Sequence, residues 1–231
     1  MYFSENLRFL RQLRRGMTQE NLAEQMGVSR QTVSKWESGA AYPELDKLIE
    51  LCQYFNCSMD AMLCEAMNKL NDAYSNLRVE TIAAFQYVRY TVISREPEHD
   101  AIRRIRSWAD ANKLRSPVVI GWDFPFLSQE QVSVYHMHGY TAACVLPQDF
   151  CLPEKEDAEV LSQAEQKYAA ITIKEPFVEP FSIIPNAYKA LAAYMQVNGI
   201  VHKNDDEVIS CFEREYEKDG VGYMDVYIAV E

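Results

Sequence analysis

The chain has 231 residues, 48% of them hydrophobic and 25% charged, and a formal net charge of −11. These values are ordinary for a globular protein with one large domain or two small ones. No apolar run approaches the roughly 18 residues of a membrane span, and the opening MYFSENLRFLRQLRR lacks the apolar centre of a signal peptide. We therefore expect a cytoplasmic protein with no membrane partner.

The acidity is unevenly distributed along the chain. Residues 1–64 hold seven Lys/Arg and eight Asp/Glu, whereas residues 65–231 hold sixteen and twenty-six. Overall acidity argues against broad affinity for nucleic acid, but it leaves room for a local DNA-binding face. A basic cluster in the first segment is compatible with such a face; it consists of Arg8, Arg11, Arg14 and Arg15.

The cysteines and histidines give no metal signature. Six cysteines, at positions 52, 57, 64, 144, 151 and 211, form no Cys-x-x-Cys pair, which favours reduced thiols. His136 and His138 could share one strand face and bind a metal, but they have no obvious third ligand. We predict neither a metal nor a cofactor.

Helix signals follow one another closely through residue 64. Ser4, Thr18, Ser29 and Ser58 are candidate N-caps, and Gly16, Gly27 and Gly39 are candidate ends. The apolar spacing between them fits helices, with Trp36 facing inward. The pattern predicts five short helices in a compact all-α domain over residues 1–64.

Residues 17–39, MTQENLAEQMGVSRQTVSKWESG, have the layout of a helix, a tight turn and a second helix. This segment closely resembles the helix-turn-helix domain of the XRE family, the bacterial lambda-repressor/Cro type, over about residues 4–64. The resemblance implies that Arg30, Gln31 and Lys35 face base edges while Gln19 and Thr32 contact phosphates of a double-stranded operator. It also implies binding as a homodimer.

Residues 65–80 are expected to form a helical connector. Leu63, Met67, Leu70, Tyr74 and Leu77 step by four and three, as in a heptad seam. The seam could dimerise, or it could pack on its own subunit. Two heptads do not decide between these alternatives.

After residue 80 the pattern changes to strands mixed with helices. The order β-α-β-β appears over residues 86–97, 98–114, 117–124 and 138–147, and it recurs over 167–176, 183–199, 207–216 and 223–230. The third elements of the two units align Trp122-Asp123 with Phe212-Glu213. The acidic linker 148–166 between the units is expected at the surface.

The two tandem units and the terminal MDVYIAV resemble the GyrI-like effector-binding domain of AraC-type and MerR-type regulators. The resemblance implies two units about a pseudo-twofold, with a cleft for a small, often cationic and lipophilic molecule. The predicted fold is therefore multi-domain: a five-helix domain (1–64), a connector (65–80) and an α+β effector-binding domain (81–231).

Glu213 falls at the family position of an acid on the penultimate strand that meets the ligand's cation. Alternation along the strand places Glu213 and Glu215 on one face, and Phe212 and Arg214 on the other. A buried carboxylate needs a partner, which a cation would supply, and aromatic rings would add cation–π attraction. Candidate aromatic walls are Tyr227, Trp122 and Tyr140. Alternatively, both acids are exposed, or Glu213 pairs with a structural Arg or Lys.

The sequence thus predicts a ligand-responsive transcription regulator rather than an enzyme. Two alternatives remain open for the second domain. It could hydrolyse xenobiotics by means of Glu213, Glu215 and Tyr227, or its acidic surface could bind a protein.

Overall fold

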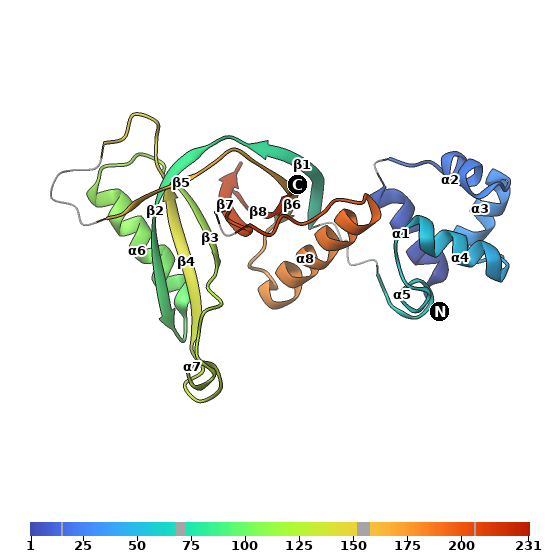
Figure 1. Ribbon diagram of the computed structural model, residues 1–231, viewed down its shortest axis with the longest axis horizontal. Coiled ribbons are helices and arrows are strands. Elements are labelled where there is room, and N and C mark those ends of the chain that lie inside the picture. Colours follow the sequence, from blue (N-terminus) through green and yellow to red (C-terminus); the bar gives the residue numbers. More distant parts are fainter. Residues whose placement is uncertain (15, 68–72, 152–157, 206) are drawn as a thin grey trace. The chain divides into compact units, whose positions relative to one another are not determined.

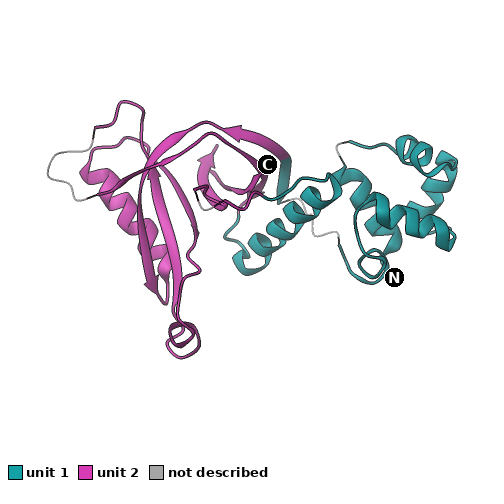
Figure 2. Ribbon diagram, viewed as in Figure 1, with its two compact units in different colours: residues 1–77, 176–202, 231 teal, residues 78–175, 203–230 magenta. Residues whose placement is uncertain are grey.

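The computed structural model describes residues 1–14, 16–67, 73–151, 158–205 and 207–231. They fall into two compact units (Figure 2). The helical unit contains residues 1–77, 176–202 and 231, and the sheet unit contains residues 78–175 and 203–230. No helix among the described residues is long and apolar enough to cross a membrane.

The helical unit contains the five helices that were expected and one from late in the chain. They are α1 (Phe3–Leu13), α2 (Gln19–Met26), α3 (Arg30–Glu37), α4 (Leu45–Tyr54), α5 (Met59–Cys64) and α8 (Pro180–Val197). The predicted caps Thr18, Ser29 and Ser58 each accept a backbone N–H of the first turn. The cap predicted at Ser4 is wrong. The N-cap is Tyr2, and the helix begins two residues earlier than predicted, at Phe3, whose side chain is fully buried.

Helix α8 groups with the N-terminal helices although it belongs to the second sequence repeat. Just beyond its end, the Asn198 side chain donates a hydrogen bond to the carbonyl of Leu13 at 3.1 Å. The Gln196 side chain donates to the carbonyl of Asn56. The C-terminal end of α8 is therefore tied to the segments that end α1 and follow α4.

Eight strands form one sheet in the order β1-β6-β8-β7-β3-β4-β2-β5 (Figure 1). Their bounds are β1 Tyr74–Ile82, β2 Phe85–Ser94, β3 Val118–Asp123, β4 His138–Val145, β5 Val160–Gln163, β6 Gln166–Lys174, β7 Cys211–Lys218 and β8 Val221–Val230. The order β2-β4-β3 of the first repeat is mirrored by β7-β8-β6 of the second, so the strands obey the predicted pseudo-twofold. The repeats meet where Gly121 of β3 pairs with Glu213 of β7.

The sheet unit has two apolar cores, one on each face. Helix α6 (Pro97–Ala111) covers the first face (Figure 1). There Ile105 and Trp108 pack against Val88, Tyr140 and other strand residues. The second face is lined by residues that alternate with these along the strands. Its core includes Tyr87, Ile120, Tyr168, Phe212 and Tyr227. The multi-domain fold class is confirmed.

Two expectations about the segments between domains are corrected. The helical connector predicted over 65–80 is wrong in its described residues. Helix α5 ends at Cys64, and Glu65 is extended. Tyr74–Ile82 is strand β1, which pairs with β6, so a tertiary pairing overrides the short heptad spacing. Leu70 lies outside the described residues. The surface linker contains β5, which pairs with β2 and buries Gln163 at 2% exposure, and part of it (152–157) lies outside the described residues.

Candidate DNA-binding and ligand-binding sites

Helices α2 and α3 form the helix-turn-helix, and local signals set its turn. Thr18 and Asn21 make a reciprocal capping box at the start of α2, and Gly27 ends α2 with a left-handed φ of 63°. Ser29 then caps α3 by accepting the N–H of Thr32 at 3.1 Å. The apolar sides of both helices are buried, with Val33 fully enclosed.

The predicted base-reading residues lie on the exposed side of α3. Arg30, Gln31 and Lys35 are all exposed, whereas Trp36 is 4% exposed and belongs to the core. Thr32 is half-buried, and its hydroxyl lies 2.9 Å from that of Ser29. The three exposed side chains are long donors, which suits base edges in the major groove.

The basic cluster of α1 serves mainly inside the helical unit. Arg11 makes two hydrogen bonds to the carboxylate of Glu37, from Nε at 2.5 Å and Nη2 at 3.1 Å. Arg8 donates to the backbone carbonyl of Glu37, and Arg14 donates to that of Tyr54. Arg15 lies outside the described residues. These described arginines therefore tie helices together rather than form a separate phosphate-binding patch.

Glu37 was not found by sequence reasoning, yet it joins the three helices around the turn. Its side chain is 3% exposed and also accepts a hydrogen bond from Gln19 Nε2 at 2.8 Å. Gln19 opens α2 and Glu37 closes α3, so the carboxylate connects both helices with Arg11 of α1. The predicted phosphate contact Gln19 thus also has an internal partner. No local signal distinguishes such a glutamate.

The five predicted ligand residues divide between the two faces of the sheet. Glu213, Glu215 and Tyr140 lie on the α6 face and line a cavity of about 60 Å³ together with α6 side chains. Trp122 and Tyr227 lie on the opposite face. There Tyr227 is 1% exposed and stacks on Phe212 at 4.5 Å, and Trp122 packs against Tyr87.

Tyr140 is at the centre of the α6-face site. Its ring is 6% exposed and crosses β3 above Gly121, where an added Cβ would lie 2.2 Å from the tyrosine oxygen. Its hydroxyl donates to Glu213 Oε2 at 3.4 Å. Burial raises the pKa of Tyr140, and the nearby carboxylates raise it further, so the hydroxyl stays protonated and donates.

Several carboxylates act on the charge of this hydroxyl. Those that raise the pKa of Tyr140 belong to Glu213, Glu98, Glu215 and Asp123. Burial raises the pKa of Glu215, while Arg106, 4.0 Å away, acts in the opposite direction. Desolvation likewise raises the pKa of Glu98, with added repulsion from Glu215 and Asp123. Two acids, Glu213 and Glu215, and one arginine, Arg106, thus line this cavity.

The opposite face holds a charge network that the sequence did not reveal. Asp225 is 2% exposed and accepts hydrogen bonds from Thr172 at 2.6 Å and from Arg214 at 2.9 Å. Arg78 and Tyr227 donate to the same carboxylate at 3.4 and 3.2 Å. Arg214 and Asp225 are register partners on β7 and β8, but their pairing is not encoded in either strand alone.

The residues predicted for hydrolysis and for metal binding do not come together in the structure. The hydrolytic set is divided, because Tyr227 lies on the face opposite Glu213 and Glu215. His138 begins β4, while His136 lies in the preceding turn with φ of 53°. The described residues contain no group of three or more His, Cys, Asp or Glu that could hold a metal. All six cysteines are free thiols.

Comparisons with known proteins agree with the helical unit. Residues 7–62 match the helix-turn-helix family HTH_3, which confirms the domain predicted from the sequence. The HTH-type transcriptional activator BcrR of Enterococcus faecalis is 44% identical over 63 residues, which cover 27% of this chain and 30% of BcrR. The chain thus spans about a third of the curated relative that it matches.

Similar solved structures extend beyond this domain, with low sequence identity. The crystal structure of the EcmrR C-terminal domain is 13% identical, with a TM-score of 0.47 over 68% of this chain and 97% of that one. A cryo-EM structure of an EcmrR–DNA complex is also 13% identical, with a TM-score of 0.48 over 93% of this chain and 85% of that one.

Proposed function

We propose that the protein is a ligand-responsive transcription regulator that binds an operator through α3 and senses a lipophilic cation on the α6 face of its sheet. The observation that carries the second part is the pair Glu213 and Glu215, which line one cavity with the buried Tyr140, at the junction of the two repeats. The Tyr140 hydroxyl donates to Glu213. The two tandem units also fit the GyrI-like resemblance of the sequence. Repression or activation would depend on which state binds DNA better.

The proposed DNA-binding surface is the exposed side of α3. Arg30 and Lys35 can donate to guanine edges, and Gln31 can pair with adenine. A single small module has modest affinity, so we propose that a homodimer binds two half-sites. A DNA operator also fits the overall charge, because the acidity resides outside residues 1–64.

The proposed cation site must open to take an organic ligand. Its cavity of about 60 Å³ holds only about two water molecules. Ile102 and Arg106 of α6 form its outer side, and Arg106 is partly exposed. We propose that an incoming cation displaces Arg106 from Glu215 and takes over its charge-compensating role. The ligand would then bias the conformation of α6, which gives the sensor a physical signal.

The test uses tetraphenylphosphonium as a compact lipophilic cation and triphenylphosphine oxide as its neutral counterpart, with the full chain in a calorimeter. We expect the cation to bind and Glu213→Gln to weaken it at least tenfold (~1.4 kcal/mol). The matched control is Glu217→Gln, which removes an exposed carboxylate farther along β7. Equal binding of both probes, or equal effects of both substitutions, would contradict the cation site.

A second measurement joins the site to DNA. An operator would be selected from random DNA with the full chain, and its affinity measured with and without the cation. We expect the cation to change the affinity of the unmodified chain and to have a much smaller effect on Glu213→Gln. Lys35→Gln should weaken the operator complex and relax the preference for guanine at the contacted position. A cation that binds without altering DNA affinity would exclude the regulatory coupling.

A further inference from the structure

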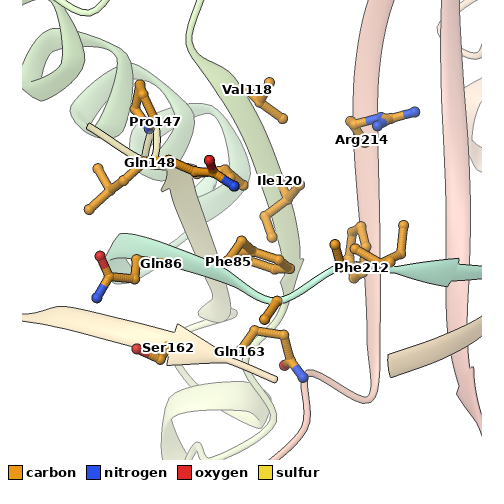
Figure 3. Close-up of a pocket in the computed structure, with 15 residues that line it drawn as sticks. Phe85, Gln86, Val118, Ile120, Pro147, Gln148, Ser162, Gln163, Phe212 and Arg214 are labelled. Atoms are coloured by element: carbon orange, nitrogen blue, oxygen red, sulfur yellow. The ribbon is translucent and has the colours of Figure 1, made fainter. Parts of the chain in front are cut away.

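A cavity larger than that of the proposed cation site lies on the face of the sheet opposite α6. It has a volume of about 530 Å³, within the range of small-molecule sites. Its walls come from the β1–β2 turn and from β3, β4, β5 and β7 (Figure 3). Phe85, Ile120 and Phe212 form its apolar floor.

The charge of this cavity is opposite to that of the α6-face site. None of the 15 lining residues is acidic, and Arg214 is the charged one among them. The absence of acids is unexpected in a chain with a net charge of −11. The other polar groups come from glutamine and serine side chains, which accept or donate without a charge. A cation would find no counter-charge on these walls.

Arg214 can serve a ligand without leaving a buried charge alone. Its side chain is 38% exposed, and the guanidinium offers five donors, one of which reaches Asp225. Asp225 also accepts hydrogen bonds from Thr172, Arg78 and Tyr227. The Tyr216 hydroxyl donates as well, so the carboxylate keeps four partners if Arg214 turns toward the cavity. Because Asp225 has other hydrogen-bond donors, Arg214 can bind the anionic group of a ligand.

We propose that this cavity is a second ligand site, which binds an apolar molecule that carries a single carboxylate. The apolar body would lie on Phe85, Ile120 and Phe212, and the carboxylate would accept hydrogen bonds from Arg214. This site is separate from the cation site, and the two prefer opposite charges. The strand β7 contributes to both, through residues that alternate between its faces.

The test measures binding of dodecanoate to the full chain by calorimetry, below its micelle concentration, with dodecanol as the uncharged counterpart. We expect saturable binding of dodecanoate, with dodecanol at least tenfold weaker. Arg214→Gln should remove this preference by weakening dodecanoate at least tenfold. Ala84→Trp, at an exposed wall position, should fill the cavity and abolish binding of both.

The control is Arg89→Gln, which removes an exposed arginine of β2 outside the cavity lining and should leave binding unchanged. Circular dichroism melts verify that each variant folds. The proposal is overturned if dodecanoate does not saturate, if Ala84→Trp leaves its affinity intact, or if Arg214→Gln and Arg89→Gln act alike. Dodecanoate should not compete with tetraphenylphosphonium; competition would place the anion in the cation site and also overturn this proposal.

Discussion

The two faces of β7 differ in charge, although their residues alternate along one strand. On the α6 face, Glu213 and Glu215 lie among further carboxylates around Tyr140. On the opposite face, Arg214 joins Arg78 at the buried carboxylate of Asp225, and Arg78 also pairs with Glu80 at 2.6 Å. The first face has an excess of acids beside a small cavity, and the second has a balanced network beside a large apolar one.

The difference shows how a polar strand can lie in the middle of a sheet. The run CFEREYEK has too many charges for an ordinary central strand, and either set alone would be costly to bury. Because side chains alternate along the strand, Glu213 and Glu215 lie on the α6 face and Arg214 lies on the opposite face. The Arg214 face is compensated inside the protein, whereas the Glu213 face has a net negative charge that a ligand can neutralise.

The largest expected effect comes from removing the Asp225 carboxylate, which compensates the charges of Arg78 and Arg214. Asp225→Asn keeps the shape but leaves Arg78 and Arg214 without their shared carboxylate. We expect the free energy of unfolding to fall by about 3 kcal/mol, the cost of breaking a buried ion pair. Urea denaturation monitored by tryptophan fluorescence measures it.

The control for this variant is Asp219→Asn in the β7–β8 turn. Asp219 is exposed with φ of 54°, a conformation that Asn also tolerates. We expect a change within about 0.5 kcal/mol. If Asp225→Asn proves equally mild, the network is not the internal compensation described here.

The parts of this comparison that the sequence could predict are local. The caps at Thr18 and Ser29 and the left-handed Gly27 lie within a few residues of the helices they define, so the helix-turn-helix could be predicted closely. Alternation likewise predicted the division of Glu213 from Arg214. Both signals depend on neighbours in the chain.

The parts that could not be predicted depend on partners far away in the chain. Arg78 and Asp225 are 147 residues apart, and Arg11 and Glu37 are 26 apart. Strand β1 exists because it pairs with β6, not because its own residues exclude a helix. The sequence also grouped Tyr227 with Glu213, since an unknown register cannot say which face a tyrosine on a neighbouring strand occupies.

A smaller effect is expected from closing the space that Tyr140 occupies. Gly121→Ala would place a methyl group 2.2 Å from the Tyr140 oxygen and 2.6 Å from its ring. We expect a loss of about 1–3 kcal/mol, as for other overpacked cores, and weaker cation binding because the hydroxyl leaves Glu213. Gly222→Ala is the control, because nothing lies within 4 Å of its added Cβ. Equal stability of the two variants would mean that Tyr140 moves without cost.

The smallest effect tests the charge of Glu215 on the α6 face directly. Burial raises the pKa of Glu215 above its ordinary value of 4.5, so the folded protein holds this proton more tightly than the unfolded chain. The ionised carboxylate therefore costs stability at neutral pH, and this cost vanishes as the pH falls below 4.5. Glu215→Gln should be slightly more stable than the unmodified chain at pH 7, by up to about 0.5 kcal/mol.

The free energies of unfolding of Glu215→Gln and of the unmodified chain should become equal near pH 4, where Glu215 is also largely neutral. Urea denaturation at both pH values measures the difference, with the exposed Glu217→Gln as the control that should show none. A Glu215→Gln variant that is less stable at pH 7 would mean that Arg106 compensates the carboxylate fully. The two faces of β7 would then both be balanced, and the α6 face would have no excess negative charge to attract a cation.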